Sequence, residues 1–413
     1  VDGAANFAAD VTFADGADII TASAGTSNFR AGVNAGNSIT SGGNYNVVVG
    51  DEAGTAITTG DNNTAVGYGA LDANTTAGNN SAFGYTALTA NTTGHENDSF
   101  GAYSLAANTE GNDNCAFGTA TLSANTTASN NTAFGRAALE LNTTGANNVA
   151  VGRSALDSNT TADNNTAVGH ASLAANTTGT SNTAVGKSAL AANITGSNHT
   201  ALGKDALLVS TAGGYDTALG DSVLKANTTG NYNTGVGASA LAANTTASDN
   251  TAVGSNSLTA NTTGTRMTSV GSRSGMQNTT GNYNAFFGYD AGESNTTGAS
   301  NTFIGDSAGR ETTTASNNTA VGQSALLANT TGAQNTAIGT ASLTVNTTGL
   351  ENFAGGYAAL DANTTASYGT AVGARALQRN TTGANNTGLG YKALFANTTG
   401  ADNVGLGAET LLG

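Results

Sequence analysis

The hydrophobic and polar positions of this chain repeat every 17 residues. A glycine recurs at this interval from Gly50 to Gly407 without an insertion, which places 22 glycines in register. The consensus that runs from each glycine is G-x-x-A-L-x-A-N-T-T-G-x-x-N-T-A-V, and the stretches that begin at Gly135 and Gly322 follow it closely. A strict internal period of this length indicates a repeat architecture rather than a set of globular domains.

Each repeat predicts one coil of a solenoid with two short strands and two turns, since 17 residues are too few for a helix–turn–helix unit. The first strand is expected over N-T-A-V and the second over A-L-x-A-N. Ala and Leu also favour helix, but the few residues between turn signals allow little more than one helical turn. The predicted fold class is therefore all-β: a parallel β-solenoid, or β-roll, rod of about 22 coils stacked ~4.8 Å apart.

The columns of the repeat also predict which residues face inward. Alternate residues of a strand point to opposite sides, so the apolar residue before each glycine is expected in the core, as at Val66, Phe83, Phe134, Leu202 and Ile304. The neighbouring alanines are then expected on the surface, as at Ala65, Ala82, Ala133, Ala150 and Ala167. Because this second column carries no charge in any coil, it is interpreted as a seam between chains, and the rod as a homotrimer.

Two asparagine columns predict hydrogen-bonded ladders inside the coil. One asparagine precedes the glycine by four residues, as at Asn63 and Asn80, and the other follows it by seven, as at Asn74 and Asn91. Stacked amides can donate to one another from coil to coil. His199 stands where the first ladder has an asparagine. The recurring glycines supply the positive φ that tight corners need.

The two ends of the chain depart from the repeat. Residues 1–45 contain the strand-like segments ADVTFADG and ADIITASAG and are expected to form an N-terminal cap or attachment segment, with the solenoid over 46–413. The last coil stops at GAETLLG without a polar cap. Solenoids normally need caps, so this end is expected to continue or to dock onto another molecule.

Composition and charge narrow the function classes. The chain has 57 glycines, no proline and only 9% charged residues; disordered chains are usually rich in Pro, Glu and Lys, and a proline-free chain suits an unbroken hydrogen-bonding ladder. The net charge of −15 disfavours nucleic acid as a partner. No apolar stretch is long enough for membrane insertion, and the single Cys115 excludes a disulfide framework.

No constellation of residues points to catalysis. His95, His170 and His199 are not paired with a nearby Cys, Ser or Asp in a catalytic arrangement. The carboxylates, such as Asp72, Asp157, Glu293 and Asp361, are scattered over variable positions. Glycosidase chemistry needs two carboxylates at a fixed separation, and no calcium-loop motif is present. The chain is therefore not expected to be an enzyme or to hold a cofactor or a metal site, with an incidental calcium ion between acidic loops as an alternative.

The recurring N-T-T triplets allow three interpretations. They match the N-x-[ST] acceptor of N-glycosylation, but asparagines stacked at ~4.8 Å leave no room for a glycan on each. Ice-binding solenoids usually present T-x-T, whereas adjacent threonines such as Thr75 and Thr76 point to opposite sides. An inner asparagine ladder beside a threonine corner is the favoured interpretation.

One outer column is a candidate interaction site. The residue after the glycine is basic in five consecutive coils, at Arg136, Arg153, His170, Lys187 and Lys204. It is tyrosine in five other coils, at Tyr68, Tyr85, Tyr289, Tyr357 and Tyr391. Tyr and Arg are enriched at recognition surfaces. The column is expected either to be a solvated corner, to bind an anionic surface glycan, or to contact a neighbouring chain.

The segments NTAVGYGAL, NTAVGKSAL and NTAIGTASL resemble the head repeats of YadA-like trimeric autotransporter adhesins. Those repeats read roughly N-S-V-A-I-G-x-x-S-x-A-x-G, and the family forms a trimeric left-handed parallel β-roll. Similar Asn/Thr/Gly-rich repeats occur in marine bacteriophage tail fibres. The resemblance covers residues 46–413, and the repeat here is longer in the N-T-T-G corner. It implies a trimeric fibre with a role in attachment.

The expected function is a structural fibre or adhesive stalk, a homotrimeric rod of a phage tail fibre or cell-surface adhesin. Its expected location is extracellular or on a virion surface, and its expected partners are copies of itself and a surface glycan receptor. A secreted subunit that polymerises end to end into an extracellular filament is the alternative, motivated by the uncapped last coil. An ice-binding or polysaccharide-acting β-helix is a more distant one.

Overall fold

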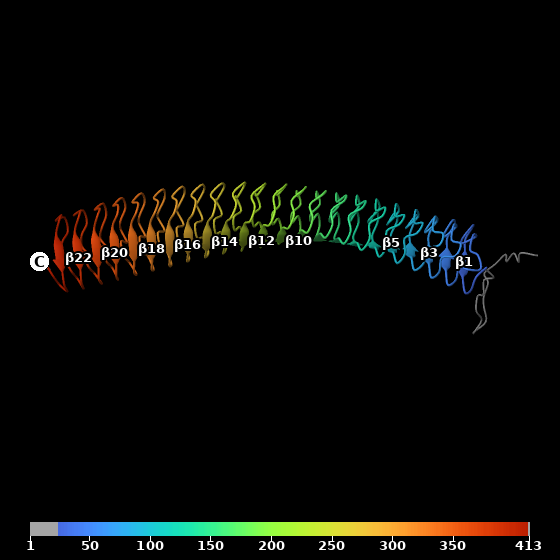
Figure 1. Ribbon diagram of the computed structural model, residues 1–413, viewed down its shortest axis with the longest axis horizontal. Helices are drawn as coiled ribbons and strands as arrows, with labels where there is room; N and C mark the ends of the chain where they lie inside the picture. Colours follow the sequence, from blue (N-terminus) through green and yellow to red (C-terminus); the bar gives the residue numbers. More distant parts are fainter. Residues whose placement is uncertain (1–23, 412–413) are drawn as a thin grey trace, which may run out of the picture. The chain divides into compact units, whose positions relative to one another are not determined.

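The structure, a computed structural model, describes residues 24–411. The described residues divide into two compact units, with the boundary between residues 130 and 131. In the described part, each unit is a parallel β-solenoid in which every coil contributes one short strand (Figure 1). The predicted all-β solenoid with a 17-residue repeat is confirmed.

The strands are all three residues long. Those of the first unit are β1 Phe29–Ala31, β2 Val47–Val49, β3 Thr64–Val66, β4 Ser81–Phe83, β5 Asp98–Phe100 and β6 Cys115–Phe117. Those of the second unit are β7 Thr132–Phe134, β8 Val149–Val151, β9 Thr166–Val168, β10 Thr183–Val185, β11 Thr200–Leu202, β12 Thr217–Leu219, β13 Thr234–Val236, β14 Thr251–Val253, β15 Thr268–Val270, β16 Ala285–Phe287, β17 Thr302–Ile304, β18 Thr319–Val321, β19 Thr336–Ile338, β20 Phe353–Gly355, β21 Thr370–Val372, β22 Thr387–Leu389 and β23 Val404–Leu406.

Within each unit, consecutive strands pair in parallel at the offset of one repeat. Thr166 of β9 lies opposite Thr183 of β10, and Ala167 lies opposite Ala184. The pairing begins with β1, whose Phe29 lies opposite Val47 of β2. Residue 46, the predicted domain boundary, is thus where the repeat becomes strict, while the stacking of coils already includes residues 29–31. The segments predicted to be strand-like before residue 24 lie outside the described residues.

The predicted orientation of the strand is wrong. Most strands have an alanine in the middle, such as Ala65 or Ala133, which is 0% exposed and faces the inside of the coil. The apolar residue before the glycine faces outward instead: Phe134 is 39% and Leu202 is 46% exposed. The reason is space, because the coil is so narrow that a small residue suffices on the strand, while leucines such as Leu139 fill the interior from the opposite side.

The second predicted strand is also absent from the described coils. The A-L-x-A-N segment forms a chain of turns in which the leucine adopts a left-handed conformation, with φ of 56° at Leu71 and 53° at Leu88. This segment still hydrogen-bonds to its neighbours, since Leu71 N donates to Ala87 O at 3.0 Å and Thr86 N donates to Tyr68 O at 2.9 Å. Leu71 thus bonds to the following coil and Thr86 to the preceding one, so the corner is a ladder without being a strand.

The recurring glycine is required by both conformation and space. At Gly67 the φ of 134° belongs to a region that residues with a Cβ rarely adopt. A Cβ there would lie 2.4 Å from the carbonyl oxygen of Gly84 in the next coil. Only glycine therefore lets the coils approach to hydrogen-bonding distance at this corner.

The core keeps its volume by paired exchanges between two columns. Glycine replaces the leucine at Gly54, Gly275, Gly292 and Gly309, and in three of these coils the strand alanine is replaced by Val48, Phe286 or Phe303. Gly275 has Ser269 on its own strand, and Phe286 of the next coil fills the space beside it. A Cβ on Gly309 would lie 2.5 Å from the Phe303 ring, and one on Gly292 would lie 2.7 Å from the Phe286 ring. The strand column and the leucine column therefore face each other across the coil and share one space.

No helix in residues 24–411 is both long and apolar enough to cross a membrane.

Candidate functional site: outer columns and a buried polar defect

The basic column lies on the outside of the second unit. Arg136, Arg153, His170, Lys187 and Lys204 follow β7 to β11, one per coil, and all five side chains are exposed. We call these five residues the basic ladder. Strand pairing at every step keeps their backbones in register, so the five side chains follow each other at roughly the 4.8 Å spacing of paired strands.

Few acidic side chains of the described residues neutralise the basic ladder. Lys204 Nζ lies 3.0 Å from Asp205 Oδ2 and 3.9 Å from Asp221 Oδ1. Its pKa is raised, first by the hydrogen bond to Asp205. Within the described residues, the other four members form no ion pair. Like charges at this spacing repel one another, so the ladder is unfavourable unless something outside the coil balances it.

Tyr68 and Tyr85 occupy the same column position in the first unit. Their rings stack with centroids 5.4 Å apart and an interplanar angle of 14°, and both side chains are about half exposed. Tyr103, one position further along its own coil, packs edge-on against Tyr85. The structure therefore brings the two predicted tyrosines together into a small aromatic surface.

An outward apolar stripe is the surface feature that the sequence prediction missed. It consists of the strand residue before each glycine; in the first unit these are Val49, Val66, Phe83, Phe100 and Phe117, and in the second unit they run from Phe134, Val151, Val168, Val185 and Leu202 to Leu406, interrupted by Gly355. Aromatic members stack face to face, with ring centroids 4.6 Å apart for Phe83 and Phe100. The pair of Phe303 and Gly309 could have revealed the stripe. A strand position that is large where the leucine position is small must face inward, so the next residue along the strand must face outward.

The first asparagine ladder is confirmed as an inner column. Each asparagine accepts from the backbone amide of its counterpart in the next coil, as when Asn165 N donates to Asn148 Oδ1 at 2.9 Å. Its own amide donates to a carbonyl of the next coil, as from Asn165 Nδ2 to Gly179 O at 2.9 Å. These bonds satisfy polar groups that are otherwise buried without water.

The second ladder runs through the N-T-T triplets. Asn176 Nδ2 donates both to Asn159 Oδ1 and to Gly179 O, each at 2.9 Å. The triplet asparagines from Asn74 to Asn380 are buried, so their amides are not accessible for glycosylation. The first threonine of the triplet is used in the corner as well, since Thr160 Oγ1 donates to Thr177 O at 3.2 Å.

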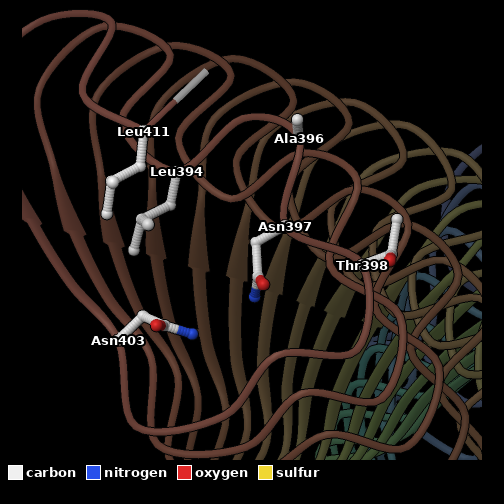
Figure 2. A pocket seen from close by; sticks show the side chains of 6 residues that line it. All are labelled: Leu394, Ala396, Asn397, Thr398, Asn403 and Leu411. Carbon is white, nitrogen blue, oxygen red and sulfur yellow. The ribbon is translucent and has the colours of Figure 1, made fainter. Parts of the chain in front are cut away.

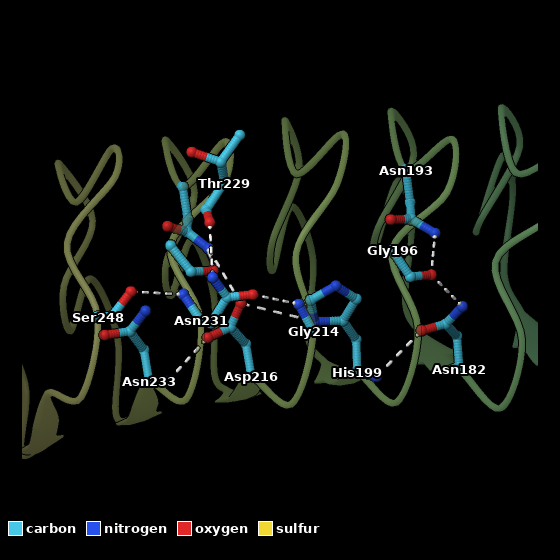
Figure 3. A network of polar contacts seen from close by, with 12 residues as sticks. Asn182, Asn193, Gly196, His199, Gly214, Asp216, Thr229, Asn231, Asn233 and Ser248 are labelled. Carbon is cyan, nitrogen blue, oxygen red and sulfur yellow. Dashed lines mark hydrogen bonds and ion pairs between the residues drawn. The ribbon is translucent and has the colours of Figure 1, made fainter.

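Both ladders are interrupted in neighbouring coils of the second unit. His199 and Asp216 replace asparagines of the first ladder, as the sequence predicts for His199, and Ser210 replaces one of the second. Figure 3 shows the His199 ring between Asn182 and Asp216. His199 Nδ1 lies 3.6 Å from Asp216 Oδ2, and both side chains are fully buried. Asp216 also accepts from Asn227 Nδ2 at 3.0 Å, which replaces the acceptor that Ser210 cannot supply.

Burial keeps this acid–base pair close to neutrality. Desolvation lowers the pKa of His199 to about 4. It raises the pKa of Asp216 to about 7, against the opposing hydrogen bonds from Asn233 and Asn227. Neither group reaches solvent, so the pair is a structural defect in the ladders and not an accessible reaction centre.

A second charged group holds three coils together. Glu293, which is 5% exposed, pairs with Arg273 and with Arg310, whose Nε lies 3.1 Å from Glu293 Oε2. Asp290 is buried beside it, 3.5 Å from Arg273 Nε, and desolvation raises its pKa. The two arginines neutralise the two carboxylates, so this cluster fits a structural role rather than cation binding.

The remaining candidates of the sequence stay apart. His95 and His170 are exposed, and Asp72, Asp157 and Asp361 lie in separate coils. Among the described residues, no group of three or more His, Cys, Asp or Glu side chains is arranged to hold a metal ion.

A pocket in the last described coil is lined by Leu394, Ala396, Asn397, Thr398, Asn403 and Leu411 (Figure 2). Four of these belong to the leucine and asparagine columns, so the pocket shows the interior layout of a coil.

Comparison of the sequence with protein-family models gives no match, and comparison with curated protein sequences gives none either. Function is therefore argued from the geometry of the coils and from the resemblance of the short repeat motif.

Proposed function

We propose that this chain is a structural fibre or adhesive stalk that assembles side by side with copies of itself. The single observation that carries the proposal is the outward apolar stripe, which continues through coil after coil while the charged residues occupy other columns. Exposed apolar surface of this extent marks an interaction site. A partner must match it at every coil.

A second copy of the chain is the partner that fits. The stripe repeats at the coil spacing, and a copy lying parallel in register presents the same repeat over the same length. The outward threonines of the strands, such as Thr166 and Thr183, give a flat neighbouring column that permits close approach. The resemblance to trimeric adhesin head repeats favours three chains, with an extracellular or virion-surface location and an attachment role.

The low content of charged residues and the ladder-filled interior support a structural rather than a catalytic role. The asparagine ladders, corner glycines and backbone bonds all connect one coil to the next, so each added coil extends the same interactions. Stability in such arrays grows with nearest-neighbour contacts. A protein built this way suits a mechanical spacer.

The mass of the purified chain in solution tests the proposal. Three chains of 40.1 kDa give about 120 kDa in sedimentation equilibrium or light scattering. A stable monomer of 40.1 kDa at micromolar concentration would reject lateral assembly through the stripe.

A further inference from the structure

We propose that the basic ladder binds a linear anionic polysaccharide, carboxylated or sulfated, that lies along the coils of the second unit with one anionic group at each coil. The proposal does not depend on the number of chains in the assembly. It assigns a ligand class to five residues that the structural role leaves unexplained.

Basic residues are concentrated in this one column. The whole chain has 12 Lys and Arg residues against 27 Asp and Glu. Four of those 12, together with His170, occupy one column in five consecutive coils, and all five side chains are exposed. On a protein of net charge −15, such a run produces a local field of opposite sign to its surroundings.

The regular spacing of the basic ladder matches that of an extended polyanion. Strand pairing fixes the register of the five residues, so their spacing is roughly 4.8 Å per coil. An extended polymer of uronic acid or sulfated sugars carries its charges at regular intervals along one direction, as the ladder does. A compact anion, by contrast, would contact one or two members and leave the others unbalanced.

A second copy of the chain that lies in register does not supply the anions. The acidic residues of the same stretch, residues 135–219, are Glu140, Asp157, Asp163, Asp205 and Asp216. They fall in four different columns, and Asp216 is buried. A neighbour in register therefore presents no acidic ladder that could pair with the basic ladder.

The experiment compares two double variants that remove the same charge. Arg153→Gln with Lys187→Gln takes two cations from the ladder, and Lys225→Gln with Arg266→Gln takes two from other columns of the same unit. Binding of the full chain to polygalacturonate, dextran sulfate and neutral dextran is measured by biolayer interferometry at about 0.15 M salt. Circular dichroism and light scattering of each variant report folding and assembly.

The wild-type chain is expected to bind one or both anionic polymers but not neutral dextran. The ladder variant should bind about tenfold more weakly, as expected for losing two solvent-exposed charge pairs, while the control variant stays within about twofold. A stronger response to polygalacturonate identifies carboxylate as the recognised group, and a stronger response to dextran sulfate identifies sulfate.

Several results would overturn the proposal. They are the absence of binding to both anionic polymers, equal weakening in the two variants, and an unchanged affinity in the ladder variant. Tighter binding to oligothymidylate than to either polysaccharide would assign the ladder to nucleic acid instead. A change in the mass of the ladder variant's assembly without a change in binding would make the ladder an interchain contact.

Discussion

At the scale of single residues, the replacements at His199, Ser210 and Asp216 show how the buried ladders tolerate an interruption. Ser210 is too short to continue its ladder, and its hydroxyl has no hydrogen-bond partner. Asp216 accepts the amide hydrogen that Asn227 would otherwise give to an asparagine at position 210. The three replacements therefore act together, and His199 completes them by facing the Asp216 carboxyl.

The buried pair predicts opposing pH effects that single variants will separate. The folded pKa of His199, about 4, lies below the ordinary 6.5, so the folded state binds fewer protons than the unfolded state between these values. The folded pKa of Asp216, about 7, lies above the ordinary 3.8, so the folded state binds more protons over this range. In the wild-type chain the two contributions to the free energy of unfolding cancel over much of the interval.

When either residue is replaced, the pH dependence of the free energy of unfolding reports the other residue alone. In His199→Asn, Asp216 remains, and stability should fall as the pH rises from about 4 to about 7. In Asp216→Asn, His199 remains, and stability should rise as the pH rises from about 4 to about 6.5. Urea unfolding at about pH 4.5 and about pH 6.5 should show differences of opposite sign, up to about 2–3 kcal/mol. Slopes of the same sign in both variants would contradict the opposite directions of the two pKa shifts.

At the scale of the coil, the strand and the leucine turn behave as two halves of one core. Phe303 on β17 occupies the space that a leucine fills in most other coils, and Gly309 opposite it has room for no side chain. Side chains on both sides of the coil are fully buried and closely packed, so a change of side-chain volume in one column must be matched by an opposite change in the other.

A double-mutant cycle at Phe303 and Gly309 tests this packing. Phe303→Ala alone should cost about 3–5 kcal/mol because it leaves a cavity, and Gly309→Leu alone should destabilise because its Cβ meets the Phe303 ring at 2.5 Å. The double variant recreates the alanine–leucine arrangement of the other coils and should recover most of the loss. Additive destabilisation, measured by chemical denaturation, would contradict a shared core space.

The period, the solenoid and both asparagine ladders could be predicted from the sequence because glycine and asparagine recur at fixed positions of the repeat. The orientation could not be predicted from the strand alone. Alternation along a three-residue strand states that Ala133 and Phe134 face opposite sides but not which side is inside. The larger residue, Phe134, was assigned to the core because of its size. In the structure the narrow coil has room only for alanine on the strand, and Leu139 fills much of the interior from the opposite side.

The turn that replaces the second predicted strand was missed for a different reason. Leucine rarely adopts a left-handed conformation, and the cost is of order 1–3 kcal/mol per residue. Here it recurs in most coils, with φ of 52° at Leu139 and 53° at Leu173. Complete burial of each leucine and the amide bonds between coils offset this cost, but neither is visible in the local sequence.

At the scale of the whole molecule, the corrected orientation moves the proposed contact between chains from the alanine column to the apolar stripe. Glutamate at Ala150 and Ala167 would now enter the coil interior and unfold it. Glutamate at Val151 and Val168, one residue further along, would leave the coil intact and place charges on the outer surface. The basic ladder follows the corner glycine and is a separate surface.

The measurement that tests the central claim most directly is the mass in solution of the Val151→Glu/Val168→Glu variant beside that of the wild-type chain. If the stripe joins the chains, the wild type should have a mass of about three 40.1-kDa chains, and the variant should dissociate toward 40.1 kDa while keeping its β-sheet circular dichroism. Matched control substitutions at the exposed threonines Thr178 and Thr161, outside the stripe, should leave the assembly intact. A variant that keeps the wild-type mass would contradict assembly through the apolar stripe.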